Sequence, residues 1–339
     1  MSPAQRTTRV KQLAADFGFD RAAVAPAEPI ARSAFVQQWL DRGYAGQMHY
    51  LQRAERTDPR HLLPGLRSII VLASNYHQPP PELPPAGPRG RVAMYAWGDD
   101  YHTVIKKKLW SLIDALRDAF DEPFDARPCV DTAPIIEREL AAAAGLGWIG
   151  KNTMVLHVDL GSYFFLSEIL TTLELAPDAP TADHCGSCRR CLDACPTDAF
   201  VKPYVMDASR CIAYLTIELR DEIPEPLREL MGDWVFGCDV CQDVCPYNHR
   251  APETTEPCFA PRDSTPRPPL RELVIADDEQ LRPLRRKSAI SRAKPAMLRR
   301  NAAIALGNTG DHADALILDQ AAASDPHAQW AAEHLRARN

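Results

Sequence analysis

Long apolar runs are missing from this sequence. It contains no stretch of about 18 consecutive apolar residues that could cross a bilayer as a helix. Residues 1–11 are polar and lack the apolar core of a secretory signal. We therefore expect a cytoplasmic protein without a membrane partner. In that reducing compartment, disulfides do not persist.

Phosphate-binding glycine motifs are also missing. No Gly-x-x-x-x-Gly-Lys-Ser/Thr loop occurs, and the Gly-x-Gly-x-x-Gly that starts at Gly145 closes an alanine-rich helical segment. A dinucleotide fingerprint would follow a strand and open a helix. The 39 Lys and Arg against 45 Asp and Glu give a net charge of -6, which argues against binding nucleic acid over the whole surface.

Cysteine is abundant, with ten residues, and seven of them fall into two runs that each end in Cys-Pro. The runs are Cys185-x2-Cys188-x2-Cys191-x3-Cys195-Pro196 and Cys238-x2-Cys241-x3-Cys245-Pro246. In the first spacing three thiolates bind one 4Fe-4S cluster, and the fourth reaches a neighbouring cluster. The second run has the last three cysteines of the same pattern. The sequence therefore predicts a bacterial ferredoxin-like domain with two 4Fe-4S clusters.

This crossing of the fourth cysteine divides the ligands into two sets. The first set is Cys185, Cys188, Cys191 and Cys245, and the second is Cys195, Cys238, Cys241 and one further cysteine. We choose Cys211 for the last place because it lies between the two runs. Cys129 and Cys258 compete for it, but both lie outside that segment.

Structural zinc and disulfides are the other common uses of closely spaced cysteines. Zinc sites use pairs of Cys-x2-Cys with four ligands per ion, and this gives no reason for the two Cys-Pro endings. Disulfides fit a small exported domain, whereas this chain of 339 residues is long enough to bury its own core. The spacing favours iron–sulfur clusters.

Ahead of the cysteine runs, helical and strand-like patterns alternate. Apolar periodicity predicts helices at 5–17, 35–51 and 101–120, and strands at 22–25, 68–74, 92–97, 154–157 and 163–170. Residues 79–90 carry six prolines and are expected to form a loop. The alternation indicates an α/β or α+β domain over residues 1–175.

Asp131 stands at the expected junction between a strand and the alanine-rich helix. Two interpretations remain open for it from position alone. It could be a helix N-cap, whose carboxylate accepts backbone amides, or a carboxyl group that takes part in chemistry.

Five segments together resemble the epoxyqueuosine reductase family. They are Val130-Asp131-Thr132, Ala144 to Asn152, Cys185 to Pro196, Arg210 to Thr216 and Gly237 to Pro246. The resemblance extends over almost the whole chain. It implies a cobalamin-dependent enzyme that reduces the epoxide of epoxyqueuosine at the wobble position of tRNA and gives queuosine. The clusters would pass electrons singly to the cobalt, and an unidentified low-potential donor would reduce them.

The resemblance also implies roles for individual residues. Asp131 matches the proton donor, which must stay protonated near neutrality in an apolar or stacked site that raises its pKa. The implied cobalamin contacts are Arg56, Asp131, Arg138, Lys151, Asn152, Val155 and Ala213. Ala213 stands where family members carry serine, so a hydroxyl contact to the corrin ring would be missing. The segment from Asp100 to Ile105 lacks the glycine of Asp-x-His-x-x-Gly, so we expect no histidine ligand to cobalt.

The C-terminal part differs in character. Residues 281–310 carry eight Lys and Arg and no acidic residue. These side chains could form a solvated face. Because the implied substrate is tRNA, we expect them to contact its phosphates. Segments 300–307 and 329–336 repeat weakly, as in a small array of HEAT-like helices. We expect residues 1–175 to form the cobalamin-binding domain, 176–258 the two-cluster domain and 259–339 the basic helical tRNA-binding region, in a monomer.

Two other functions compete with this interpretation. A ferredoxin-like electron carrier would need the clusters but no substrate site, and the more than 180 residues ahead of Cys185 argue against it. A cobalamin and iron–sulfur reductive dehalogenase-like enzyme acting on a small molecule would have no use for a basic helical region.

Overall fold

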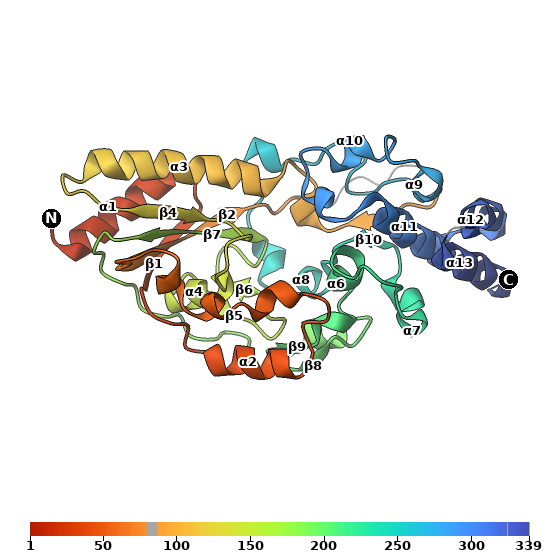
Figure 1. Cartoon of the computed structure of the whole chain (residues 1–339), viewed down its shortest axis with the longest axis horizontal. Coiled ribbons are helices and arrows are strands. Elements are labelled where there is room, and N and C mark those ends of the chain that lie inside the picture. The colour runs from red at the N-terminus through yellow and green to blue at the C-terminus, as the bar shows by residue number, and fades with distance from the viewer. Residues whose placement is uncertain (80–86, 324, 339) are drawn as a thin grey trace.

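A computed structural model describes residues 1–79, 87–323 and 325–338. The molecule is elongated, and its two termini lie at opposite ends of the longest axis (Figure 1). Most of the expected proline-rich loop, residues 80–86, lies outside the described residues. None of the described helices combines the length and the apolarity needed to span a bilayer.

An antiparallel sheet of four strands forms the framework of the N-terminal part. Its strands, in spatial order, are β1 (Arg21–Pro26), β2 (Ser68–Asn75), β7 (Phe164–Thr171) and β4 (Ala126–Cys129). Every neighbouring pair is antiparallel. All eight residues of β2 are buried, because elements cover both faces of the sheet and alternate side chains enter two different cores. The class is therefore mixed α and β, of the α+β kind.

The two faces of the sheet carry different helices. The helices α1 (Pro3–Asp16) and α3 (Tyr101–Ala119) lie on one face, and α4 (Glu137–Ala143) lies on the other (Figure 1). Along β2, Ile70 and Leu72 enter the first core, whereas Ile69 and Val71 enter the second. The buried stripe of α3 is Ile105, Leu109, Leu112, Ile113 and Leu116. The helix that apolar periodicity predicted at 101–120 is therefore confirmed.

Most of the expected long elements are confirmed, and two are corrected. The helix expected at 35–51 is α2 (Ser33–Asp41), followed by the 3-10 turn η1 (His49–Gln52). Gly43 and Gly46 separate them with φ of 71° and 54°, outside the helical region. The strand expected at 92–97 is wrong. Only β3 (Arg91–Val92) is extended, and the chain then turns into η4 (Met94–Ala96), where the Trp97 indole donates to the Val92 carbonyl.

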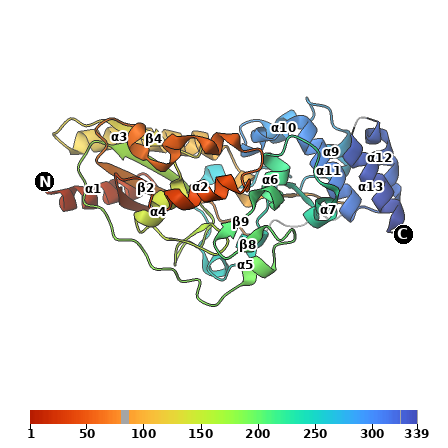
Figure 2. The ribbon, with the colours of Figure 1, turned by 60° about the horizontal axis from the view of Figure 1, so that its bottom comes forward.

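Short elements make up the cysteine-rich part and the approach to it. The strands are β5 (Trp148–Ile149), β6 (Val155–Leu156), β8 (Phe200–Lys202), β9 (Val205–Met206) and β10 (Trp234–Phe236). The helices are α5 (Arg190–Asp193), α6 (Ile212–Ile217), α7 (Glu225–Arg228) and α8 (Val240–Asp243). One helix starts inside each cysteine run, and these two helices, α5 and α8, pack together. Figure 2 shows α5, β8 and β9 projecting away from α3.

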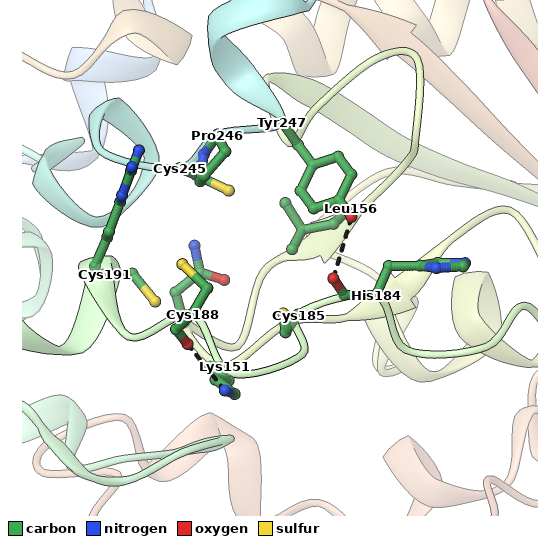
Figure 3. Close-up of a pocket in the computed structure, with 11 residues that line it drawn as sticks. Lys151, Leu156, His184, Cys185, Cys188, Cys191, Cys245, Pro246 and Tyr247 are labelled. Atoms are coloured by element: carbon green, nitrogen blue, oxygen red, sulfur yellow. Dashed lines mark hydrogen bonds between the residues drawn. The ribbon is translucent and has the colours of Figure 1, made fainter.

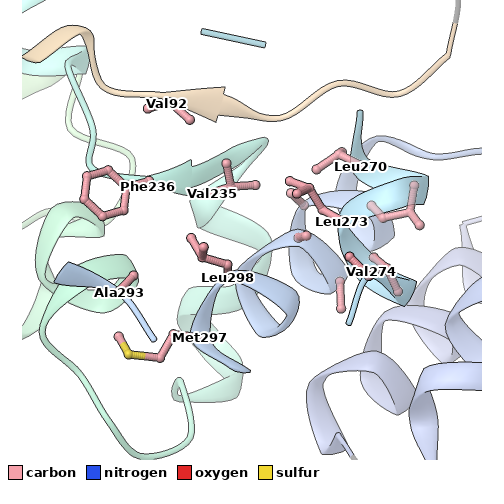
Figure 4. Packing of buried hydrophobic residues seen from close by; sticks show 14 of the residues in the cluster. Val92, Val235, Phe236, Leu270, Leu273, Val274, Ala293, Met297 and Leu298 are labelled. Atoms are coloured by element: carbon pink, nitrogen blue, oxygen red, sulfur yellow. The ribbon is translucent and has the colours of Figure 1, made fainter. Parts of the chain in front are cut away.

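The C-terminal part is helical and shares its core with distant segments. Its helices are α9 (Leu270–Ile275), α10 (Arg282–Arg285), α11 (Pro295–Thr309), α12 (Ala315–Ala322) and α13 (Pro326–Ala337). In Figure 4, Val92 of β3 and Phe236 of β10 lie in the same cluster as Leu270 of α9 and Leu298 of α11. β3 and β10 pair in parallel. One continuous core therefore joins residues of all three expected parts.

Buried polar groups on α11 fasten this part to the cysteine-rich part. The Arg300 guanidinium is 5% exposed and donates to the carbonyl oxygens of Leu215 (2.8 Å), Leu219 (3.0 Å) and Asp221 (2.8 Å). These carbonyls belong to α6 and the turn after it, where a helix leaves acceptors without partners. Arg300 is thus a structural residue, although it lies in the basic stretch.

Substitution of Arg300 tests this role. We expect Arg300→Met to lower the free energy of unfolding by about 2–3 kcal/mol, because buried carbonyl oxygens lose a charged donor. Arg299→Met is the matched control. Its guanidinium is partly exposed and pairs with Asp278 at 2.8 Å, so a change below about 1 kcal/mol is expected. Chemical denaturation followed by circular dichroism measures both, and equal effects would contradict the assignment.

Candidate functional site

The first predicted set of cysteines surrounds a cavity. Cys185, Cys188, Cys191 and Cys245 line a space of about 220 Å³ (Figure 3). Among the described residues, no three His, Cys, Asp or Glu side chains are placed to hold a single metal ion. The four thiols instead surround a volume, the arrangement that a polynuclear cluster with one thiolate per iron requires.

An unpaired donor points to the same kind of group. The Trp148 indole N–H is buried and has no hydrogen-bond partner within the described part of the chain. It lies beside the Cys185 thiol and in one apolar cluster with Leu156 and Cys245. Buried donors without acceptors are rare in folded proteins. A thiolate or sulfide held in this cavity would accept this hydrogen bond, so the residues fit an iron–sulfur cluster.

Lys151 and Asn152 hold the cysteine loops. The Lys151 ammonium donates to the carbonyl oxygens of Gly186 (2.6 Å) and Cys188 (2.9 Å). The Asn152 amide, which is buried, donates to the carbonyl oxygen of Cys241 at 3.3 Å. Both residues were expected to contact cobalamin from the family resemblance. Their contacts in the described chain are with the backbone of the two cysteine runs.

The second predicted set of cysteines lies deeper. Burial raises the pKa of the Cys211, Cys238 and Cys241 thiols, and nearby thiols of the same set raise each pKa further. Cys195 is one of these neighbours for both Cys211 and Cys238. The structure therefore brings together Cys195, Cys211, Cys238 and Cys241. Cys258, a competitor for the eighth place, is exposed elsewhere.

Asp131 lies in a turn between β4 and α4. Its φ of 50° is in the left-handed region, which costs free energy for a residue with a side chain. The N-cap of α4 is Ile136, which makes no side-chain capping bond. The alternative of Asp131 as a helix cap is therefore wrong, because five residues separate it from the first residue of α4. Its carboxylate is free for other contacts.

A histidine at the start of α3 binds this carboxylate. Nε2 of His102 donates to Oδ2 of Asp131 at 3.1 Å, and Nδ1 donates to Oδ1 of Asp100 at 2.7 Å. Burial opposes the charged imidazole, but the bonds to Asp100 and Asp131 and their negative charges outweigh it and raise the pKa of His102 to about 9. The imidazole is therefore protonated at neutral pH and donates from both nitrogens.

The pKa of Asp131 is lowered in the chain as described, whereas the expected proton donor requires a raised pKa in a stacked site. Burial alone would raise it, but the bond and charge of His102, helped by Tyr101 and Arg292, lower the pKa below the usual range. In the chain as described, Asp131 is thus ionised at neutral pH. The proton of this pair resides on His102.

Side chains from distant segments lie around Asp131, whose side chain is partly exposed although burial is the largest influence on its pKa, and we infer a crevice at this place. Arg56 of η2 (Ala54–Thr57) and Arg292 of η9 (Ala289–Arg292) lie over the Tyr50 ring, with guanidinium carbons 5.3 and 5.7 Å from its centroid. Arg292 also pairs with Glu218 at 3.0 Å. Asp131 interacts electrostatically with both arginines. The crevice thus receives residues from all three expected parts of the chain.

The remaining expected cobalamin contacts differ in position. Arg138 lies near Asp131 and donates to the Thr153 carbonyl at 2.7 Å. Val155 is buried in the core between the sheet and α4, and Ala213 packs against the C-terminal core. Neither makes a polar side-chain contact, as expected of these residue types.

The sequence did not indicate four residues of the crevice as partners of Asp131. They are Tyr50, Tyr101, His102 and Arg292. His102 was considered only as part of a cobalt-binding motif. The usable signal was Asp100, a helix N-cap with a histidine two residues later, because such a carboxylate can hold both the backbone N–H and the imidazole of that histidine.

This arrangement defines a two-cluster iron–sulfur protein with a separate proton-bearing site. A family model described as "4Fe-4S double cluster binding domain" matches residues 184–248. A second model, "Epoxyqueuosine reductase QueG, DUF1730", matches residues 56–132. An epoxyqueuosine reductase of Gloeobacter violaceus is 42% identical over 315 residues, which cover 91% of this chain and 98% of the relative. The chain belongs to the epoxyqueuosine reductase family.

Two solved structures are similar over nearly the whole chain. One is an epoxyqueuosine reductase with an epoxyqueuosine-modified tRNA-Tyr stem loop, with a TM-score of 0.85, 28% identity, and coverage of 98% of this chain and 99% of that one. The other is an epoxyqueuosine reductase of Bacillus subtilis whose aspartate catalytic loop is swung out of the active site. It has a TM-score of 0.84, 27% identity and coverage of 98% of both chains.

A histidine titration tests the His102 pair. We expect the imidazole of His102 to titrate near 9. In Asp131→Asn its pKa should fall, because one of two partner carboxylates is lost, yet remain above the ordinary value of about 6.5 because Asp100 is retained. A raised pKa stabilises the folded state fully below about pH 6.5, and this contribution disappears as pH rises through 9. NMR of histidine-labelled protein measures the pKa, with His102→Gln to assign the signal. An unchanged titration in Asp131→Asn would contradict the pairing.

Proposed function

We propose that this protein reduces the epoxide of epoxyqueuosine to an alkene in tRNA and so forms queuosine. The family supports this activity, since curated relatives with this name are about 40% identical over most of the chain. The similar structure that holds an epoxyqueuosine-modified stem loop supports the substrate. The reaction breaks both C–O bonds of the epoxide, consumes two electrons and two protons, and releases water.

The observation that carries the proposal is that the segment η4 contacts both the crevice and the cysteine runs. The Met94 N–H donates to the carboxylate of Asp239 at 2.6 Å, and Asp239 lies between Cys238 and Cys241. The next residue, Tyr95, interacts electrostatically with Asp131. The source of electrons in the cysteine-rich part and the source of the proton at Asp131 therefore lie next to the same segment, η4.

Two 4Fe-4S clusters would be held by the two sets of cysteines. Cys185, Cys188, Cys191 and Cys245 would bind one cluster, and Cys195, Cys211, Cys238 and Cys241 the other. When bound, these clusters supply electrons one at a time. The cavity lined by the first set, the donor of Trp148 and the proximity of the second set support this division.

Cobalamin would occupy the crevice beside Asp131. Asp131 has a side chain that is 56% exposed, and Arg138 is also exposed, yet desolvation is the largest influence on the pKa of each. From this combination we infer a concave site at Asp131 and Arg138, which would suit a large flat ligand. Arg56 and Arg138 could donate to its amide side chains, with Asp131 facing the reacting centre. Bound cobalamin would supply the two-electron chemistry at the epoxide.

The protein's own part in the chemistry is to hold and deliver a proton. His102 carries the proton at 3.1 Å from Asp131. Closure of the crevice over a flat ligand would exclude water and favour the neutral pair over the ion pair. The proton would then move to Asp131, which could donate it to the epoxide oxygen. Asp131 can therefore still act as the proton donor although its pKa is lowered in the chain as described.

The C-terminal helices would bind tRNA. Within residues 281–310, Arg286, Lys287 and Lys294 are exposed, whereas Arg282 and Arg299 pair with Glu279 and Asp278. The exposed three are the better candidates for phosphate contacts. We propose that α11, α12 and α13 form a short HEAT-like array, because α13 packs on both other helices.

The three parts of the chain would divide these roles. Residues 1–175 would bind cobalamin, 176–258 the clusters and 259–339 the tRNA. A tRNA substrate sets the activity in the cytoplasm, and we propose a monomer that receives electrons from a low-potential donor protein.

Iron content tests the choice of the eighth ligand. We expect about eight iron atoms per chain in the reconstituted wild type. Cys211→Ala should hold fewer, with either an empty second site or a three-iron cluster visible by electron paramagnetic resonance. Cys258→Ala is the control and should keep the full content, since Cys258 is exposed outside both runs. The reverse result would exchange the roles of these two cysteines.

Turnover tests the function itself. Anaerobic cluster-loaded protein is mixed with cobalamin, a chemical reductant and tRNA from cells that lack the activity, and the digested nucleosides are analysed. We expect epoxyqueuosine to become queuosine only with cobalamin present. Asp131→Asn should lower kcat about 100-fold or more, since general acids contribute about 10²–10⁴-fold. Survival of the epoxide with clusters and corrinoid intact would mean another substrate.

A further inference from the structure

A buried carboxyl group without a hydrogen-bond partner lies under the Asp131 turn. Glu168 is on the central strand β7 and is 0% exposed. It stands opposite Val71 on one neighbouring strand and Cys129 on the other, on the side of the sheet that faces α4. Neither of its carboxyl oxygens has a hydrogen-bond partner within the described residues. An apolar core offers no reason for an acid at this place.

A second carboxyl group lies above it and contacts the turn. Glu137 is the first residue of α4 and interacts with Glu168. Its Oε1 accepts the Asp131 backbone N–H at 2.5 Å. This bond ties together residues six positions apart in the chain. It therefore closes the turn that carries the proposed proton donor.

The Asp131 turn needs such a restraint. The φ of 50° at Asp131 is unfavourable for a residue with a side chain and persists only where surrounding contacts hold it. Two further restraints on the turn are a bond from the Thr132 N–H to the Val130 carbonyl and one from Arg56 to the Ile135 carbonyl at 3.3 Å. The first is within the turn, and the second fixes its far end. Among the bonds of the described chain, the bond to Glu137 fixes the Asp131 backbone to α4, whereas His102 of α3 holds its carboxylate.

Burial and neighbouring negative charges keep Glu137 and Glu168 protonated. Asp131, Glu137 and Glu168 are three neighbouring carboxyl groups. The cations that act on them are His102 from α3, Arg138 from α4, Arg56 from η2 and Arg292 from η9. Burial raises the pKa of Glu137, and the negative charge of Asp131 raises it further. Burial and Glu137 raise the pKa of Glu168. A protonated Glu137 still offers its carbonyl oxygen to the Asp131 N–H, and its hydroxyl can turn to Glu168.

We propose that Glu137, supported by Glu168 beneath it, is the positioning residue that holds the Asp131 turn closed against His102. The reach of its carbonyl oxygen, and not its charge, sets the position of the turn. Release of this one bond lets Asp131 leave His102 and separates the proton from its acceptor. The link from this geometry to turnover rests on the proposed function, whereas the geometry itself does not.

Two variants separate reach from charge. Glu137→Gln keeps the acceptor oxygen at the same distance but cannot ionise. Glu137→Asp keeps the carboxyl group and a residue that suits a helix start, but its side chain is one methylene shorter. We expect the Gln variant to behave as wild type. We expect the Asp variant to lower kcat by about 10–100-fold with KM within about twofold, because a catalytic group is misplaced while substrate contacts remain.

The His102 titration and hydrogen exchange test the position of the turn independently of catalysis. In Glu137→Asp the open turn removes Asp131 from His102, so the pKa of His102 should fall below its wild-type value of about 9. Hydrogen exchange of the peptide that contains Asp131 should become faster. Glu137→Gln should leave both unchanged. Glu139→Asp is the matched control. Glu139 lies on α4 like Glu137, but its side chain pairs with Arg32 at 3.1 Å and makes no described contact with the turn.

The outcomes are distinct. A wild-type His102 titration and wild-type exchange in Glu137→Asp would overturn the proposal, and so would a Gln variant that behaves like the Asp variant. Should the wild type fail to reduce epoxyqueuosine, the proposed function fails, but the titration and exchange still decide the role of Glu137. Unchanged iron content and melting temperature in each variant exclude a general loss of folding as the cause.

Discussion

The hydrogen bond from Met94 to Asp239 is the contact on which the arrangement of the two reactive regions depends. Asp239 is 4% exposed, and in the sequence it stands between Cys238 and Cys241, two of the proposed cluster ligands. Loss of a buried acceptor typically costs about 1–3 kcal/mol. The parallel pairing of β3 with β10 supports the same junction. A segment from the N-terminal part thus fixes both the wall of the crevice and the distance to the cysteine runs.

Periodic and spaced features were readable from the sequence. The apolar stripe of α3 and the buried strands β2 and β7 follow local patterns, and the cysteine spacing reflects how thiolates surround a cluster. The strand expected after Arg91 failed because a buried indole turns the chain back after two residues. The carboxylate–imidazole contact of Asp131 joins residues 29 positions apart. No local pattern encodes such a pairing, so it needed the folded chain.

The sequence did not indicate where the proton of the Asp131 site resides in the described chain. A catalytic acid was expected to have a raised pKa, but two carboxylates around one imidazole store the proton on the histidine instead. The basic stretch was misleading in another way. Arg300 is used to satisfy buried carbonyl oxygens, and Arg292 reaches the crevice. Charge counts cannot separate such uses, because they depend on which helix face becomes buried.

The interleaving of the cysteine runs has a consequence for biosynthesis. With the proposed ligand sets, each cluster takes thiolates from both runs, and Cys245 completes the first set. During translation neither cluster can be finished until the second run has left the ribosome. Lys151 and Asn152, synthesised earlier, already hold positions that both loops must meet. On these ligand sets, completion of either cluster comes late in synthesis, and a chain truncated before Cys238 would carry no complete cluster.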